Sequence, residues 1–445
     1  MILSATLPFP NLPESPHPRI LILGAGFAGL KLAQKLAGSD YQVILLDKNN
    51  YHQFQPLFYQ VATSGLEPSA IAFPLRKIFH RHKNVSVRMA EVKAVDQNTN
   101  KVYTPSGFIS YDYLVLALGA DTNYFGMQNI KEHSIPMKSV SEALYIRNRV
   151  IANYEKAMNT FDETERRALM NIVIVGGGPT GVELAGAMAE LRNMILPKDY
   201  PELDFSQMQV ILAEAGKCLL AGMSPEASEH ARKYLDSLGV EIIFNAAVKD
   251  YDGYTVKVDG YPDFTTKTLV WAAGIKPNAV EGISPDQLGP VGRLVVDEYN
   301  RLKGSENIFA LGDQCLQASE ERPRGYPQVA QVAMQQASNL GTNLKRWAKH
   351  KKPRPFKYRD LGSMATVGRK LAVVDLPFWK FQGFFAWLTW LFVHLMAILG
   401  VRNKLFIFLN WAWAYLSFDV SLRLLIRPKY VKEQDRKEMI EDKDQ

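Results

Sequence analysis

Two short glycine-rich segments have the spacing of loops that bind the pyrophosphate of a dinucleotide. The first is GAGFAG at 24–29, and the second is GGGPTG at 176–181. In such a loop the first glycine allows a tight turn and the second lets the backbone approach the pyrophosphate. The third lets the following helix pack against the strand. Free N–H groups at the helix N-terminus then bind the phosphates.

An acidic residue follows each loop at the end of the next apolar segment. Asp47 ends the segment 41–46, and Glu214 ends the segment 209–213. A carboxylate at this place can accept hydrogen bonds from ribose hydroxyls and repels a 2′-phosphate. Glu214 therefore favours NADH over NADPH at the second loop. Taken alone, Glu214 also fits a solvated acid at the end of a strand.

Strands and helices are expected on either side of both loops. Apolar runs at 19–23 and 171–175 predict buried strands before the loops, and 30–36 and 182–192 predict helices after them. This context favours two dinucleotide sites over two ligand-free turns. Further strands are predicted at 111–118, 268–274 and 307–311, a helix at 329–345, and loops at 49–67 and 193–208.

These elements divide the chain into predicted domains. The fold class is α/β, with two Rossmann-like dinucleotide-binding domains and a C-terminal apolar helical membrane-attachment region. Two loops in one chain suggest a resident FAD facing an exchanging NADH. The predicted boundaries are 19–125 with 295–345 for the FAD domain, 140–290 for the NADH domain, 346–430 for membrane attachment and 431–445 for a charged tail.

Composition excludes several other classes of protein. Of the 445 residues, 47% are hydrophobic and 22% are charged, which is enough apolar material for a sizeable core. The only cysteines, Cys218 and Cys315, form neither a metal-ligand pattern nor a neighbouring dithiol, so no metal is expected. Their separation also argues against glutathione-reductase-like and sulfide:quinone chemistry. Residues 1–18 lack the features of a signal peptide, and we expect an irregular lead-in there.

The C-terminal part of the chain changes character. Residues 383–399 are almost wholly apolar and 404–418 form a shorter apolar run; both contain tryptophan and have basic flanks. Such runs are typical of helices in the membrane interface, so we favour monotopic attachment over a spanning hairpin or a buried dimerisation helix. Eight Lys and Arg residues within 345–359 fit an anionic lipid surface. No nucleic-acid motif accompanies them, so no nucleic-acid partner is expected.

The order of the motifs resembles the type II NADH:quinone oxidoreductases, which are single-subunit respiratory dehydrogenases that do not pump protons. The resemblance covers residues 19 to about 428 of the chain. The more specific segments are NYHQFQPLFYQVAT at 50–63, AQVAMQQ at 330–336 and the apolar C-terminus. GVELAG at 181–186, WAAG at 271–274 and ALGD at 310–313 occur in the same order as in that family.

The resemblance implies FAD at the first loop and NADH at the second. It assigns catalytic roles to Glu183, near the flavin and nicotinamide, and to Gln331 and Gln335, with Gln331 in the quinone site. The histidine that some mitochondrial relatives carry is replaced here by Met334. The residues expected to bind the two cofactors are Gly24, Gly26, Phe27, Ala28, Gly29, Asp47, Lys48, Gly119, Gly176, Gly178, Pro179, Thr180, Gly181, Glu183, Glu214, Ala273, Gly274, Gly312, Asp313, Gln331 and Val332.

On the residues alone, simpler interpretations compete with these roles. Glu183 fits an acid in the first helical turn, where the helix dipole stabilises the charged form. Gln331 and Gln335 fit exposed polar helix positions, and the basic pair at 369–370 fits a solvated turn. The aromatic side chains of 51–59 suit a flat apolar ligand.

The expected reaction is hydride transfer from NADH to FAD, followed by two-electron reduction of a membrane quinone, ubiquinone or menaquinone. The expected location is the cytoplasmic face of the cell inner membrane, as a peripheral protein; a homodimer is left open. The alternatives are a reductase of a soluble protein, such as a ferredoxin reductase, and a membrane-bound NADH-binding redox sensor. The apolar C-terminus argues against the first, and catalytic turnover would exclude the second.

Overall fold

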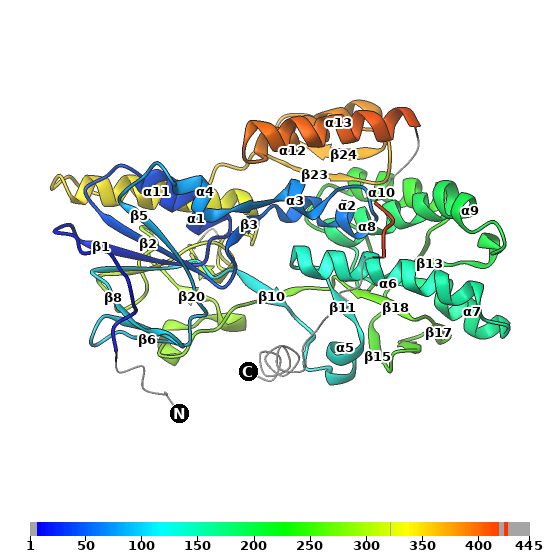
Figure 1. Ribbon diagram of the computed structural model, residues 1–445, viewed down its shortest axis with the longest axis horizontal. Helices are drawn as coiled ribbons and strands as arrows, with labels where there is room; N and C mark the ends of the chain where they lie inside the picture. Colours follow the sequence, from blue (N-terminus) through cyan, green and yellow to red (C-terminus); the bar gives the residue numbers. More distant parts are fainter. Residues whose placement is uncertain (1–6, 321, 418–421, 426–445) are drawn as a thin grey trace.

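Two five-stranded parallel sheets form the centre of the protein. The computed structural model describes residues 7–320, 322–417 and 422–425. One sheet lies on each side of the molecule in Figure 1. The predicted α/β class with two parallel sheets is confirmed. The first six residues and the predicted charged tail at 431–445 lie outside the described residues.

The first sheet is assembled from two distant parts of the chain. Its order is β21-β9-β1-β2-β5, and every neighbouring pair is parallel. The strand predicted at 307–311 does return to this sheet, because β21 pairs with β9. The bounds are β1 Arg19–Leu23, β2 Gln42–Asp47, β5 Val85–Met89, β9 Tyr113–Leu116 and β21 Ile308–Ala310.

The second sheet repeats this topology with different segments. Its order is β11-β18-β12-β13-β14, again with parallel pairing throughout. In both sheets the strand before the glycine loop is central and lies beside the strand that ends in the acid. The bounds are β11 Ile135–Pro136, β12 Ile172–Val175, β13 Val210–Glu214, β14 Glu241–Phe244 and β18 Thr268–Trp271.

Burial explains why these segments form strands. All of β12 and four of the five residues of β1 are buried, as expected where helices cover both faces of a parallel sheet. Helix α1 (Phe27–Leu36) packs against α11 (Ala330–Trp347), and each buries an apolar stripe with helical spacing. The helix after the second loop is α8 (Pro179–Glu190).

Smaller elements connect and cover the sheets. The described helices not yet given are α2 Phe58–Ala62, α3 Pro68–Ile71, α4 Leu75–Phe79, α5 Gln128–His133, α6 Val140–Met158, α7 Glu163–Met170, α9 Leu196–Asp199 and α10 Pro225–Ser237. The minor strands are β3 Tyr51–Gln53, β4 Ala72–Pro74, β6 Ala94–Asp96, β7 Lys101–Thr104, β8 Gly107–Ser110, β10 Ala120–Thr122, β15 Val248–Tyr251, β16 Thr255–Val258, β17 Phe264–Thr265, β19 Ile275–Pro277, β20 Leu294–Val295 and β22 Cys315–Leu316. Strands β10 and β19 pair where the chain passes between the two halves (Figure 1).

Two segments expected to be loops are structured. Residues 49–67 contain β3, a 3-10 turn at Gln55–Leu57 and α2, whose aromatic side chains are largely buried. Residues 193–208 begin in a π-helical turn at Leu191–Ile195 and continue into α9 and a short 3-10 turn. Both predictions were wrong because polar residues and prolines hid short helices that tertiary packing stabilises.

The C-terminal segment folds onto one side of the molecule. A three-stranded antiparallel sheet, β23 (Ser363–Thr366), β24 (Ala372–Asp375) and β25 (Lys380–Gln382), leads into two helices, α12 (Phe384–Ala397) and α13 (Val401–Ser417). These helices lie along the top of Figure 1, over the small sheet. Among the described residues, no helix has both the length and the apolar character needed to cross a bilayer.

Candidate functional site

The two glycine loops have nearly the same geometry. Gly24 and Gly176 have φ angles of 95° and 112°, which side chains other than glycine rarely adopt. A Cβ atom on Gly29 would lie 1.8 Å from the Gly24 carbonyl oxygen, and one on Gly181 would lie 1.9 Å from the Gly176 oxygen. In each loop the first and third glycines are therefore fixed by the approach of backbone to backbone.

The middle glycine of each loop has a different role. A Cβ atom on Gly26 or Gly178 would have no heavy atom within 4 Å. Each of these glycines is the N-cap of its helix, and neither cap offers a side-chain acceptor to the first-turn N–H groups. Open space beside uncapped N–H groups is the arrangement that a pyrophosphate needs.

The acids at the strand ends bind the loops directly. The Asp47 carboxylate accepts hydrogen bonds from the N–H groups of Ala25 at 2.6 Å and Asn49 at 2.7 Å. The Glu214 carboxylate accepts from Gly177 at 2.5 Å and from Gly216 at 2.6 Å. Each acid thus holds the loop in shape, a role that the sequence did not indicate. Carboxylate oxygens have further lone pairs, so both acids can still accept from a ribose.

A second segment completes the first loop's surroundings. A Cβ atom on Gly312 would lie 3.3 Å from Ala333 of α11 and 3.7 Å from Ala28 of α1, so three segments converge here. Within the described residues, no donor is hydrogen-bonded to the carboxylate of Asp313. Burial raises the pKa of this carboxyl group, while Lys138 and Arg293 act to lower it.

These features fit FAD at the first loop. The uncapped α1 and the open space at Gly26 suit a pyrophosphate, and the Asp313 carboxylate can accept from ligand hydroxyl groups. The other predicted contacts lie close by in the chain, although Lys48 is exposed and Val332 is buried inside α11.

The residues predicted for the second loop also gather at one edge of their sheet. Pro179 and Thr180 are exposed at the start of α8. Ala273 and Gly274 follow β18, and the backbone at 272–273 would be within 3 Å of a Cβ atom on Gly176. Gly119 follows β9 of the first sheet, and its carbonyl oxygen accepts a hydrogen bond from the N–H of Asn278, which follows β19. The carboxyl ends of the parallel strands of the second sheet therefore bring the second-loop residues together, and Gly119 lies at the carboxyl end of a strand of the first sheet.

Glu183 lies deeper than the sequence suggested. Because α8 begins at Pro179, Glu183 is in the second helical turn rather than the first. It is 8% exposed, and burial raises its pKa to about 8, although the Thr366 N–H, which donates to its carboxyl oxygen at 3.4 Å, acts in the opposite direction. The expectation of a carboxylate kept charged by the helix dipole was wrong, since desolvation outweighs the dipole. At neutral pH this carboxyl group mostly holds a proton.

Aromatic side chains from α2 and α12 surround this carboxyl group. Tyr59 is buried, and its pKa is raised well above the usual value by burial and by the neighbouring Glu183. The rings of Tyr59 and Trp390 have centroids 6.2 Å apart, and Trp390 stacks on His394 at 4.0 Å. Burial lowers the pKa of His394 to about 4, so this imidazole is neutral at physiological pH.

The two glutamines of α11 hold a neighbouring segment of the chain. The Gln331 amide donates to the Gly362 carbonyl oxygen at 2.7 Å and accepts from the Leu361 N–H at 3.2 Å. Gln335 donates to the Arg359 carbonyl oxygen at 2.8 Å and accepts from its N–H at 3.0 Å. Both are therefore more than exposed polar positions, since together they hold residues 359–362 along the helix.

Sequence reasoning missed several residues around Glu183. Thr366, Trp390 and His394 are distant from it in sequence, although a histidine inside an apolar helix was an available signal. Arg369 was interpreted as part of a solvated turn, which is wrong. Its backbone N–H donates to the carboxylate of half-buried Glu190, and its guanidinium lies over the Tyr415 ring at 4.8 Å.

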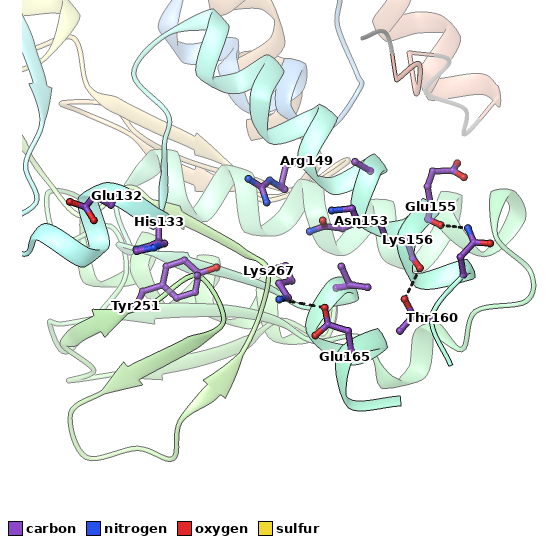
Figure 2. Close-up of a pocket in the computed structure, with 14 residues that line it drawn as sticks. Glu132, His133, Arg149, Asn153, Glu155, Lys156, Thr160, Glu165, Tyr251 and Lys267 are labelled. Carbon is purple, nitrogen blue, oxygen red and sulfur yellow. Dashed lines mark hydrogen bonds and ion pairs between the residues drawn. The ribbon is translucent and has the colours of Figure 1, made fainter. Parts of the chain in front are cut away.

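A cavity of about 780 Å³ lies away from all of these residues. It is lined by side chains of α5, α6 and α7 and by Tyr251 and Lys267, as Figure 2 shows. Lys267 precedes β18 and therefore lies at the amino end of that parallel strand, opposite the edge that carries the second glycine loop. The side chains that line the cavity include as many basic residues (Lys and Arg) as Glu residues. Two of them, Lys267 and Glu165, form an ion pair at 3.4 Å. None of the predicted site residues lines this cavity.

Comparison with known proteins gives a consistent result along the chain. Residues 18–337 match the pyridine nucleotide-disulphide oxidoreductase family, and residues 361–417 match the NDH2 C-terminal domain. Type II NADH:quinone oxidoreductase NdhA of Mycobacterium tuberculosis is 35% identical over 416 residues, covering 90% of this chain and 87% of that protein.

Solved structures share the fold. NDH2 from Plasmodium falciparum in complex with NADH has a TM-score of 0.83 at 22% identity, covering 92% of this chain and 100% of that chain. The sulfide:quinone oxidoreductase of Aquifex aeolicus has a TM-score of 0.69 at 18% identity, covering 94% and 98%. Cys218 and Cys315 of this chain are both free, and burial raises the pKa of the Cys315 thiol to about 11.

Proposed function

This chain belongs to the type II NADH:quinone oxidoreductase family, and we propose how its residues divide the oxidation of NADH and the reduction of a quinone. The supporting observation is the pair of equivalent, open glycine loops in one chain, joined to a buried carboxyl group beneath the apolar C-terminal helices. Flavin-loaded protein should oxidise NADH in the steady state only when a short-chain quinone is added. Absence of quinone-dependent turnover would contradict the assignment and favour a redox sensor.

We assign residues 19–125 and 295–345 to FAD and 140–290 to NADH. The first assignment is supported by the Asp313 carboxylate, to which no donor among the described residues is hydrogen-bonded, and by the open N-terminus of α1. When bound, the flavin supplies the chemistry that neither loop can, accepting a hydride from NADH and delivering two electrons to the quinone. The chain binds and orients both nucleotides, and we expect FAD to be the tightly held one.

Glu214 is proposed to select NADH. Its carboxylate already lies at the second loop and would repel a 2′-phosphate. In Glu214→Gln, the amide oxygen can still accept from one of the two N–H groups, of Gly177 or Gly216, while the amide NH2 faces the other, so the variant loses the charge and one loop contact together. We expect the preference for NADH over NADPH to fall about tenfold, equivalent to about 1.4 kcal/mol. The ratio of kcat/KM for the two nucleotides measures this, and an unchanged ratio would assign Glu214 a purely structural role.

Glu183 is proposed to hold the proton that quinone reduction consumes. The overall reaction, NADH + H⁺ + quinone → NAD⁺ + quinol, takes one proton from solvent in each turnover. A carboxyl group with a pKa of about 8 retains a proton at neutral pH and can release it to a developing anion. Neutral His394 and the apolar Met334 are poorer proton donors at this pH.

Gln331 is proposed to contact the quinone near the flavin, with Gln335 one turn further along α11. Replacing Gln331 by alanine should reduce quinone reduction about tenfold more than it reduces flavin reduction by NADH. Stopped-flow traces of the two half-reactions measure the difference. Asn339→Ala is the matched control. The side-chain amide of Asn339, also on α11, donates to the carbonyl oxygen of Arg354 at 3.1 Å, so this variant likewise removes a bond from α11 to a following segment. Equal losses in both half-reactions would remove Gln331 from the quinone site.

The C-terminal helices are proposed to attach the protein to a membrane as a peripheral protein. Their outer face exposes large apolar side chains, including Phe385 at 74%, Phe392 at 64% and Trp413 at 64%. The basic run at 345–359 begins in the last turn of α11, continues toward the small C-terminal sheet and suits anionic headgroups. We further propose the cytoplasmic face of the cell inner membrane as the location, and ubiquinone or menaquinone as the acceptor. A homodimer stays a prediction.

Charges on this outer face should release the protein from lipid. In the double variant Phe385→Glu and Phe392→Glu, we expect binding to phosphatidylcholine–phosphatidylglycerol vesicles to fall at least about tenfold, since each phenylalanine contributes roughly 1.5–3 kcal/mol when buried. Co-sedimentation measures the bound fraction. Phe161→Glu is the control, because Phe161 is 100% exposed between α6 and α7. Equal losses in both proteins would contradict attachment through α12 and α13.

A further inference from the structure

Phe125 combines two features that rarely occur together in one residue. Its side chain is 62% exposed, and its backbone has a φ angle of 51°. Residues other than glycine seldom take up a positive φ, and Asn and Asp are the usual exceptions, so a bulky aromatic residue in this conformation is strained. Such strain gathers at binding sites, because it persists only where the surrounding structure holds the residue in place.

Phe125 is one of the two central residues of a tight turn. The Met127 N–H donates to the Tyr124 carbonyl oxygen at 2.9 Å, and Gly126, the other central residue, has a φ angle of 82°. Positive φ at both central positions is the pattern of a type I′ turn, in which Gly, Asn and Asp dominate. The local preference of the backbone therefore opposes a phenylalanine at position 125.

The segment around the end of β18 holds this turn in place. The Trp271 indole N–H donates to the Asn123 carbonyl oxygen at 2.8 Å, and the Asn123 N–H donates to the Gly274 carbonyl oxygen at 3.1 Å. The ring of Tyr124 stacks on that of Trp271, with centroids 6.2 Å apart. A Cβ atom on Gly274 would lie 3.1 Å from the ring of Phe125, so the missing side chain lets this ring lie close to the backbone beyond β18.

The order of strands in the second sheet relates Gly274 to a bound dinucleotide. Glu214 ends β13, and an acid there marks the ribose of the adenosine half. The pyrophosphate belongs at the loop after β12, which lies between β13 and β18 in the sheet. A dinucleotide that starts at β13 and crosses β12 therefore brings its nicotinamide half to the end of β18. Gly274 and Phe125 also adjoin β19 and β10, which pair where the chain passes between the two halves (Figure 1).

We propose that Phe125 is a substrate-binding residue for the nicotinamide half of NADH, with its exposed ring packed against the nicotinamide riboside. This inference rests on the proposed place of NADH at the second loop. A phenylalanine side chain has only two torsions to fix, so it offers a large contact area at low cost in conformational entropy. The turn is already held in the free protein, which further reduces the ordering that binding requires.

Equilibrium binding to the flavin-loaded protein tests the proposal without turnover. NAD⁺ carries the nicotinamide riboside, whereas ADP keeps the adenosine and both phosphates but lacks that half. In Phe125→Asn we expect the Kd for NAD⁺ to rise about tenfold, the scale of one lost aromatic stacking contact, and the Kd for ADP to stay unchanged. Calorimetric titration measures both. Phe125→Tyr keeps the ring and should bind NAD⁺ as the wild type does.

Thermal melting separates a binding role from a structural one. Asn suits the central position of a type I′ turn, so Phe125→Asn should raise Tm or leave it unchanged. A phenylalanine that only packed on Gly274 would give the opposite result, a lower Tm together with equal weakening of both ligands. Phe161→Asn is the matched control, because Phe161 is 100% exposed between α6 and α7 and should change none of these values.

Gly178→Ala distinguishes failure of this inference from failure of the loop assignment. It should weaken NAD⁺ and ADP alike, since both ligands carry the pair of phosphates. If it does so but Phe125→Asn leaves the affinity for NAD⁺ unchanged, the role of Phe125 is wrong and the second loop stays the NADH site. If Gly178→Ala changes neither affinity, the place of NADH at the second loop is wrong, and the inference fails with it.

Discussion

Replacement of Glu183 by glutamine is expected to slow quinone reduction by about 100-fold, the scale on which one positioned acid contributes. Glutamine keeps the size and neutrality of the protonated side chain but cannot release a proton. Flavin reduction by NADH should change little, since it does not require this proton. Single-turnover measurements with NADH alone, then with quinone, separate the two steps.

The pH dependence gives this prediction a second readout. Wild-type quinone reduction should fall as pH rises through about 8, where Glu183 loses its proton, and the variant should lack this limb. The folded-state pKa lies above the unfolded value of 4.5, so the folded protein holds the extra proton between those values. The contribution of Glu183 to the free energy of unfolding therefore declines as the pH rises from about 4.5 to about 8. Melting curves of Glu183→Gln should show a smaller decline.

A comparison on the same helix makes the result interpretable. Glu190→Gln also removes a carboxyl group of α8, but one that is half-buried and binds the Arg369 backbone N–H. We expect it to affect melting more than quinone reduction. A loss of quinone reduction equal to that of Glu183→Gln would show that burial of any acid here matters, and would contradict a specific proton role for Glu183.

Alanine at Gly29 should destabilise the fold, whereas alanine at Gly26 should leave folding unchanged and weaken FAD binding. A Cβ atom at Gly29 would lie 1.8 Å from a backbone oxygen, so α1 must move from its strand. We expect a loss of about 3 kcal/mol or more in unfolding free energy, together with loss of flavin. At Gly26 the Cβ atom meets open space, so folding should be unaffected. FAD affinity should still fall at least about tenfold, because the methyl group occupies the pyrophosphate's approach.

Flavin absorbance after gel filtration, and melting curves of the apoprotein, measure the two effects. The second loop allows the same test to be repeated with NADH. Gly181→Ala should lower the stability of the protein, whereas Gly178→Ala should leave stability unchanged and raise the KM for NADH. Normal FAD retention by Gly26→Ala would show that the first loop does not bind the pyrophosphate.

The loops and sheets could be predicted because their signals are local. Strand, glycine turn, helix and acid follow one another within a short stretch, and the spacing itself carries the geometry. The role of Asp47 in holding Ala25 was less accessible, although it too depends on neighbouring elements. Short helices such as α2 were missed because their stability comes from tertiary packing rather than from their own residues.

The surroundings of Glu183 could not be predicted for a different reason. Thr366 and Trp390 reach it from segments far along the chain, and no local pattern reports that meeting. Burial then reversed the expected charge state, because the dipole of one helix is weaker than the cost of removing a carboxylate from water. Arg369 illustrates the same point, since the backbone N–H of a basic residue in a turn donates to Glu190, a partner 179 positions away in the sequence.

The split origin of the first sheet has a consequence for how the chain folds during synthesis. Strand β21 joins β9 only after the entire second sheet has left the ribosome, so this pairing closes a very long loop. Contacts of such separation form slowly, whereas the second sheet is continuous in the chain. We expect the second sheet to acquire protection in pulsed hydrogen exchange before β21 does. Until that last strand docks, Gly312 and Asp313 are absent from the first loop, and a nascent chain would be able to bind its exchanging nucleotide before its resident one.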